Sequence, residues 1–217
     1  YMDKCVESIL VGSDYADDVQ IVIVDDGSAK DETPAKADEW QQRYPDIVKA
    51  VHQENGGHGV AVMKAVANAD GVYFKNIDSD DWADADALKA LLAKLREFIA
   101  ADEKVDLVLT NYVYEHVADN TRNIVDYKGI LPEGRVFTWQ EIGKFPPNKN
   151  ILMHSVIYRT EILRACGLNE TTTFGFAAPG DLEKIGMSTE GRGCPVVLMN
   201  PLVAEQTEMR RSLLPGL

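Results

Sequence analysis

Three loops of this chain carry polar residues that could bind an anionic ligand or a cation. The first contains Asp25 and Asp26, followed by Gly27 and Ser28, at the end of the apolar run 19–24. An aspartate at the end of a strand can accept hydrogen bonds from a base or a ribose, although Asp and Gly are equally typical of a simple turn. The first loop therefore predicts either a nucleoside contact or a tight turn.

The second loop is rich in glycine and precedes a helical pattern. It spans residues 53–59 and places Gly56, Gly57 and Gly59 around His58. Glycine lets the backbone approach a ligand closely, and a helix N-terminus favours negative charge. The loop lacks the third glycine of a dinucleotide fingerprint and the Gly-Lys-Ser/Thr end of a phosphate-binding P-loop. The loop alone leaves a ligand-binding role and an ordinary turn open.

The third loop places Asp78, Asp80 and Asp81 within four residues, directly before a long helical pattern. Clustered carboxylates repel one another, and a bound divalent cation relieves that repulsion. If the preceding strand continues, Asp78 and Asp80 have the same facing. A helix cap would need one aspartate, not three. The loop therefore predicts a cation site, with capping as the alternative.

Alternating apolar runs and helical patterns surround these loops. The runs typical of strands span 19–24, 47–51, 72–77 and 105–114, and the helical patterns span 2–11 (ended by Gly12), 31–44, 60–69 and 83–100. Such alternation predicts βαβ units and a mainly parallel sheet flanked by helices. Ligands bind beyond the carboxyl ends of strands in such sheets, which is where the three loops lie.

The later part of the chain is less regular. The sequence predicts strands at 123–127, 134–137 and 152–158, a short helix at 139–144 and a helix at 160–166. Beyond residue 169 there is no sustained period of 2 or 3.6 residues, which is typical of a divergent or frameshifted end.

Composition excludes several classes of protein. The 217 residues carry a formal net charge of −13, which disfavours general binding of nucleic acid. The 3 cysteines are widely spaced and form no CxxC pair, which excludes a zinc ribbon or disulfide framework and fits a reducing, cytoplasmic compartment. No apolar run approaches the roughly 18 residues of a membrane span.

In this order, the three loops resemble the motifs of family 2 glycosyltransferases of the GT-A fold. The segments that carry the resemblance are Val24-Asp25-Asp26-Gly27-Ser28, Asn55-Gly56-Gly57-His58-Gly59 and Asp78-Ser79-Asp80-Asp81-Trp82. The resemblance is specific over residues 19–95 and continues more loosely to 154–161. It implies a Rossmann-like, mainly parallel sheet with a smaller acceptor-side portion. Residues 1–115 would be the nucleotide-sugar-binding half, 116–168 the acceptor-side half and 169–217 an atypical tail.

The resemblance also implies roles for individual residues. Asp26 would contact the base, and Asp78 would point toward the ribose and the sugar. Asp80, together with Asp78, would hold Mn²⁺ or Mg²⁺. The remaining residues expected to contact the nucleotide-sugar are Asp25, Asn55, Gly57, His58 and Ser79. His154 opens the acceptor-side strand and is a further candidate to face the site.

The activity implied is metal-dependent, inverting transfer of a sugar from a nucleotide-sugar, of the UDP-sugar class, to a glycan, lipid-linked or protein acceptor. It would take place in the cytoplasm, or at the inner face of the membrane through peripheral association. Similar proteins carry an acidic general base shortly after the acceptor-side helix, but residues 173–179 contain none, and Asp181 and Glu183 are the nearest candidates.

Two departures from the family favour other interpretations. The sequence begins inside the helix that follows the family's first strand, so we expect a truncated start, and we expect the tail not to be family sequence. Both favour a catalytically inactive, truncated or degenerate GT-A domain. A separate alternative is a nucleotidyltransferase, which also uses paired carboxylates and a metal. The motifs specify neither the donor sugar nor the acceptor and linkage.

Overall fold

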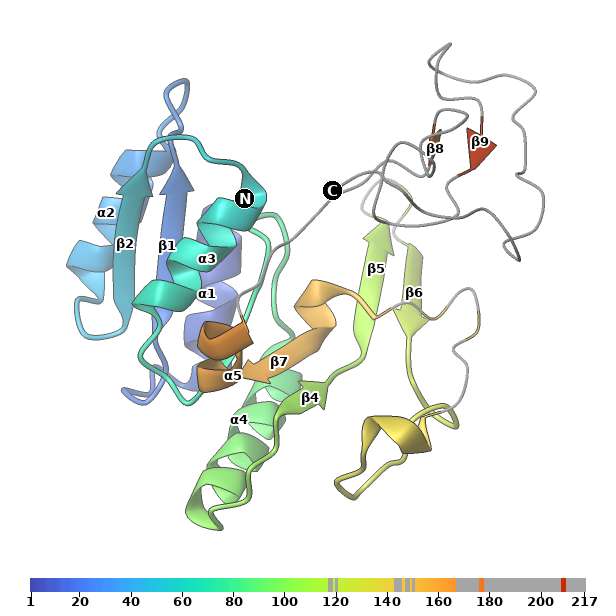
Figure 1. The fold of residues 1–217 in the computed structure, drawn as a ribbon. Coiled ribbons are helices and arrows are strands. Elements are labelled where there is room, and N and C mark those ends of the chain that lie inside the picture. Colours follow the sequence, from blue (N-terminus) through green and yellow to red (C-terminus); the bar gives the residue numbers. More distant parts are fainter. Residues whose placement is uncertain are drawn as a thin grey trace. The chain divides into compact units, whose positions relative to one another are not determined.

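The computed structural model describes most of the chain as helices, strands and connecting loops (Figure 1). The described residues are 1–116, 119, 121–142, 146, 149, 151–166, 176–177 and 208–209. The chain divides into two compact units, Tyr1–Leu168 and Asn169–Leu217. Within the described part of the second unit, the short strands β8 (Phe176–Ala177) and β9 (Glu208–Met209) pair in antiparallel fashion.

A parallel pair of strands forms the base of the first unit. Strands β1 (Ile21–Asp26) and β2 (Val48–Gln53) run side by side, and helix α2 (Thr33–Arg43) connects them. Helix α3 (His58–Asn68) packs against β1. In Figure 1 the arrowheads of β1 and β2 point the same way, so the loops that follow them lie at one edge. The apolar core here consists of Val6, Leu10, Ile21, Trp40, Ile47 and Val48.

Helices α1 (Met2–Ser13) and α4 (Ala85–Ala100) pack against each other through a glycine. A Cβ atom at Gly12 would lie 2.9 Å from Leu88 Cδ2, so a side chain there would separate the two helices. The prediction that Gly12 ends the first helix is therefore wrong. The helix continues through Gly12 to Ser13, and its C-cap residue, Asp14, takes the left-handed conformation with φ 60°.

Strand β7 (Val156–Arg159) comes from the segment predicted to be the acceptor-side half, but it pairs with two strands of the predicted nucleotide-sugar-binding half. It lies between β3 (Tyr73–Lys75) and β4 (Leu107–Leu109), antiparallel to both. Its Ile157 is 1% exposed. The predicted α/β class is confirmed, with parallel β1 and β2 flanked by helices, while the β7 sheet adds antiparallel pairing.

The remaining elements include a hairpin and short helical turns. Strands β5 (Tyr112–His116) and β6 (Thr121–Val125) form the hairpin, and helix α5 (Thr160–Cys166) follows β7. The single-turn helices are η1 (Trp139–Glu141) and η2 (Met153–Ser155). Among the helices described here, none combines the length and apolar character needed to cross a bilayer.

The strand predicted at 134–137 is wrong. Gly134 takes a φ of 71°, in the left-handed region, and this interrupts any extended run at its first residue.

Candidate functional site

The carboxylate of Asp26 joins the first two loops. Asp26 is the last residue of β1, and it accepts the backbone N–H groups of Gly56 and Gly57 at 2.8 Å each. The side-chain amide of Gln53 donates to the same carboxylate at 2.7 Å. These hydrogen bonds hold the pKa of Asp26 below its usual range, with the bond from Gln53 contributing most and those from the two glycines less. The end of β1 thereby fixes the backbone of the glycine-rich loop.

A second set of contacts closes the same junction. The Asn55 side-chain amide donates to the backbone oxygen of Asp26 at 3.0 Å. Gly27 takes a φ of 73°, and a Cβ atom there would lie 2.7 Å from the backbone nitrogen of Asn55. Glycine is therefore required at position 27 for two reasons: the backbone is in the left-handed region, and a side chain would collide with Asn55.

We predict that Gly27→Ala destabilises the protein and loosens the glycine-rich loop. The left-handed conformation costs about 1–2 kcal/mol for a residue with a Cβ, and the collision with Asn55 adds to that loss. Gly129 is a matched control, because its φ is also 73° but its Cβ would meet nothing within 4 Å. Urea unfolding should show the larger loss for Gly27→Ala. Equal losses for Gly27→Ala and Gly129→Ala would contradict the proposed crowding.

Asp25 lies behind the first turn and supports it. The residue is 4% exposed, and its carboxylate accepts the backbone N–H of Ser28 at 3.0 Å. Its other oxygen lies 3.1 Å from His52 Nδ1, and His52 Nε2 lies 3.0 Å from Asp38 Oδ1. Because carboxylates only accept hydrogen bonds, His52 must be doubly protonated to donate to both partners.

These contacts predict a pH-dependent contribution to stability. Hydrogen bonds to Asp38 and then Asp25 raise the pKa of His52. Burial opposes ionisation of Asp25, but its bonds with His52 and Ser28 bring its pKa below the usual value. The folded state therefore binds the His52 proton more tightly than the unfolded state does. The stabilisation is complete below the unfolded pKa of about 6.5 and is lost as the pH rises through the folded pKa.

The measurement is the melting temperature of wild type and His52→Gln at pH 5.5 and 8.5. We expect the advantage of the wild type to be larger at pH 5.5. His116→Gln, at the exposed end of β5, controls for the loss of a histidine. An advantage that grows toward pH 8.5 would show that the neutral imidazole is the stabilising form.

The acidic loop after β3 forms a turn that brings two carboxylates together. The Asp81 N–H donates to the backbone oxygen of Asp78 at 3.0 Å, which makes these residues the first and fourth of the turn. The Asn76 side-chain amide donates to Asp78 Oδ1, also at 3.0 Å. Because β3 ends at Lys75, the strand alternation expected for Asp78 and Asp80 no longer applies. The turn instead brings Asp81 toward Asp78.

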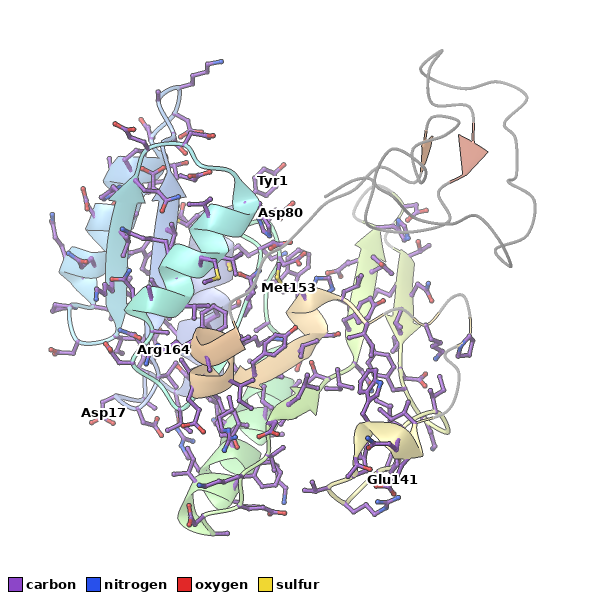
Figure 2. All side chains as sticks on the ribbon, viewed as in Figure 1. Tyr1, Asp17, Asp80, Glu141, Met153 and Arg164 are labelled. Carbon is purple, nitrogen blue, oxygen red and sulfur yellow. The ribbon has the colours of Figure 1, made fainter. Side chains whose placement is uncertain are left out.

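An imidazole from η2 completes this group. One ligand atom from each of Asp78, Asp81 and His154 lies within 4.8 Å of the other two. His154 Nδ1 is 3.9 Å from Asp81 Oδ2. In Figure 2 the labelled Asp80 and Met153 mark the two segments that meet here, since they are the sequence neighbours of Asp81 and His154. Carboxylate oxygens and an imidazole nitrogen are a donor set suited to a divalent cation.

Negative charge is concentrated at this turn, and it acts on the neighbouring titratable groups. Burial raises the pKa of Asp81, and the charges of Asp78 and Asp80 raise it further, while His154 acts in the opposite direction. Cys5 lies beneath the turn with its Sγ 3.7 Å from the backbone oxygen of Asp78. Burial, together with these carboxylates, raises the pKa of the Cys5 thiol to about 11. A bound cation would relieve this repulsion.

Helix α1 supports the acidic turn from below. Ser8 Oγ accepts the backbone N–H of Ala83 at 3.0 Å, and Lys4 places its ammonium over the ring of Trp82. These contacts tie both ends of the turn to the first helix, because Cys5 reaches Asp78 from the same face. The turn is therefore positioned by packed structure and not by its own sequence alone.

The other predicted site residues are placed as follows. Ser79 and Asp80 are exposed on the acidic turn, and His58 is the first residue of α3. Asp181 and Glu183 lie outside the described residues. Asp81 was part of the carboxylate cluster predicted from the sequence, but the family resemblance gave it no individual role. The first and fourth residues of a tight turn lie close together, and this was the signal that could have identified Asp81 as a ligand.

Comparison with known proteins identifies the family. The family model described as glycosyl transferase family 2 matches residues 1–165. This chain belongs to glycosyl transferase family 2. The putative glycosyltransferase EpsH of Bacillus subtilis (strain 168) is 36% identical over 115 residues, which are 53% of this chain and 30% of EpsH. The chain thus spans under a third of that relative.

The last part of the chain matches a different family. The family model described as phenylalanyl tRNA synthetase beta chain CLM domain matches residues 154–217. The phenylalanine–tRNA ligase beta subunit of Geobacter sulfurreducens (strain ATCC 51573 / DSM 12127 / PCA) is 54% identical over 52 residues, which are 24% of this chain and 6% of that subunit. The two family matches overlap only at residues 154–165.

A solved structure of TarS from S. aureus, residues 1–349 in complex with UDP, is also similar to this chain. It is 22% identical with a TM-score of 0.49, and the match covers 76% of this chain and 45% of that one.

Proposed function

We propose that the family 2 portion of this chain binds a nucleotide-sugar of the UDP-sugar class, together with a divalent cation, for inverting transfer of the sugar. The observation that carries the proposal is the acidic turn after β3, where Asp78 and Asp81 converge with His154. Family membership supports the reaction class. The acceptor we propose is a glycan, a lipid-linked sugar or a protein, and the place is the cytoplasm or the inner face of the membrane.

The first two loops support a contact with the base. Asp26 Oδ1 accepts hydrogen bonds from Gln53 and Gly56, and Oδ2 accepts one from Gly57. An ionised carboxylate offers about four lone-pair positions, so Oδ2 retains capacity for one more donor. The imide N–H of uracil is such a donor. We therefore assign Asp26 two tasks, which are to order the glycine-rich loop and to accept a hydrogen bond from the base.

The acidic turn supports binding of the diphosphate through a cation. The protein has a net charge of −13, so a diphosphate needs a positive group at the site. Mn²⁺ or Mg²⁺ bound there would act as a Lewis acid and stabilise the charge on the departing nucleotide. Asp78 would contribute to holding the cation, and Asp80, on the exposed side of the same turn, remains a proposed ligand from the sequence.

A second candidate function follows from the match beyond residue 165. We propose that the chain as given binds its donor but transfers sugar slowly, because the segment expected to hold the general base matches another family. The candidates Asp181 and Glu183 fall in that segment. We propose no tRNA ligase activity, because the matched 52 residues are only 6% of the Geobacter subunit.

A thermal shift experiment tests donor binding. We expect the melting temperature to rise when UDP and Mn²⁺ are added together, and to stay unchanged with either alone. At a ligand concentration of about 100 Kd, binding stabilises the folded state by about 2.7 kcal/mol, which corresponds to roughly 5–10 °C. ADP with Mn²⁺ controls for the base. No rise with UDP and Mn²⁺ would refute donor binding, and an equal rise with ADP would refute the role of Asp26.

A further inference from the structure

We propose that His154 is a protein ligand of the cation beside Asp78 and Asp81, and that its imidazole makes the site prefer Mn²⁺ over Mg²⁺. This inference rests on the proposed function, because it concerns the same cation. It adds a ligand from the acceptor-side part of the chain to a site that the sequence placed wholly on the acidic loop. The ligand atoms of the three residues lie within 4.8 Å of one another.

The spacing fits one ion with small adjustments. Metal–ligand distances of about 2.1 Å place adjacent ligand atoms about 3 Å apart and opposite ones about 4.2 Å apart. The 3.9 Å between His154 Nδ1 and Asp81 Oδ2 lies inside that range. The outer limit of 4.8 Å for the whole group lies just beyond it. The side chain of Asp81 is 50% exposed, which leaves it room to rotate toward the other two ligands.

The backbone of His154 is held in place by its surroundings. The Lys75 ammonium donates a hydrogen bond to the His154 carbonyl, and Lys75 is the last residue of β3. The neighbouring Ser155 is 0% exposed, and its carbonyl accepts the backbone N–H of Thr110 at 2.8 Å. The Lys75 side chain thus ties η2 to the strand that leads into the acidic turn.

The imidazole ring itself is oriented by an aromatic contact. The rings of His154 and Tyr112 meet edge to face, with centroids 5.1 Å apart and planes at 83°. The His154 side chain is 26% exposed, so the imidazole is partly accessible. A ligand that is already oriented loses little conformational freedom when the ion binds. The geometry therefore favours coordination by His154 over a passing electrostatic contact.

The chemistry of the donor set predicts the preference among metals. Mg²⁺ favours oxygen ligands and retains several waters, whereas imidazole suits transition metals better. Two carboxylates alone would serve Mg²⁺ and Mn²⁺ similarly. An added imidazole nitrogen shifts the balance toward Mn²⁺, and its removal should reduce the ratio of the two affinities.

The test uses Mn²⁺ as its own spectroscopic probe in the full chain. Protein labelled with ¹⁵N-histidine is mixed with Mn²⁺ and UDP, and pulsed electron paramagnetic resonance measures coupling between the ion and histidine nitrogen. We expect a ¹⁵N coupling in the wild type and in His116→Gln, and none in His154→Gln. We also expect His154→Gln to bind Mn²⁺ at least about tenfold more weakly, with a smaller change for Mg²⁺.

The outcomes separate this inference from the proposed function. Mn²⁺ that binds with UDP but shows no ¹⁵N coupling in the wild type would overturn the role of His154 and leave the proposed function standing. A coupling that persists in His154→Gln would assign the ligand to another histidine and would equally overturn it. A chain that binds no Mn²⁺ with or without UDP would overturn the proposed function itself. The wild-type spectrum needs no substitution, so a folding defect in the variant cannot hide the answer.

Discussion

The purified chain is expected to transfer sugar about 10²–10⁴-fold more slowly than a version in which residues 167–217 are replaced by the corresponding segment of an active family 2 glycosyltransferase. That factor is what a general base typically contributes. The family 2 match ends at residue 165, whereas the match to the tRNA synthetase family runs to residue 217. The replacement segment should carry an acidic residue shortly after the acceptor-side helix. Turnover would be measured as UDP release in the presence of an acceptor.

Two controls make this comparison specific. Both proteins should give the same thermal shift with UDP and Mn²⁺, because the acidic turn and the glycine-rich loop are common to them. The replaced protein should lose its gain when the new acidic residue is changed to alanine. Turnover of about 1 s⁻¹ or more by the chain as given would contradict the prediction. In that case Asp181→Asn and Glu183→Gln would show whether either carboxylate is the base.

The elements that precede the three loops could be predicted from their apolar runs. Strand β1 begins and ends two residues later than predicted, and α5 occupies its predicted residues. Local pattern was sufficient because these elements bury one face against a core that their own residues form. Long-range pairing was not predictable in the same way. The place of β7 between β3 and β4 depends on residues more than 40 positions apart.

Two of the errors at residue level share one physical cause. Gly12 looks like a helix end because glycine is common there, but a neighbouring helix requires the space. The predicted strand 105–114 divides into β4 and β5, since part of the run pairs with β7 and part with β6. In each case the partner in space, which sequence pattern does not reveal, decided the outcome.

The candidate site shows the same division. The order of the three loops led to the family, and the family model confirms that recognition. The contact of Asp26 with Gly56 and Gly57 follows from the parallel pairing of β1 with β2, because both loops then start at one edge. The meeting of Asp81 with His154 needed the turn geometry and the position of η2, which no local pattern records. The ligand roles of Asp78 and Asp80 remain predictions.

Asp78→Asn is expected to weaken metal-dependent binding of UDP by at least about 100-fold. The reason is that losing a side chain that binds the cation directly costs no less affinity than losing a residue that only orients such a side chain. The sequence predicts Asp78 and Asp80 as the ligands of the cation, whereas the structure groups Asp78 with Asp81 and His154. Asp78 is the residue common to both sets. Asparagine preserves the size of the side chain and removes its charge. Calorimetry with UDP and Mn²⁺ would measure the loss, and Asp86→Asn, in the first turn of α4, removes an equal charge nearby.

The stability of the metal-free protein gives this substitution a second, independent signature. The charges of Asp78 and Asp80 raise the pKa of Asp81, so the carboxylates of the turn repel one another when no cation is bound. Removing one charge should leave the melting temperature unchanged or raise it, while the increase caused by UDP and Mn²⁺ disappears. A large fall in the metal-free melting temperature would instead identify Asp78 as a structural residue of the turn, through its bond with Asn76. Asp78→Asn should lower the melting temperature of the metal-free protein if Asp78 is a structural residue, and should not lower it if Asp78 is a ligand of the cation. This one measurement therefore distinguishes the two explanations.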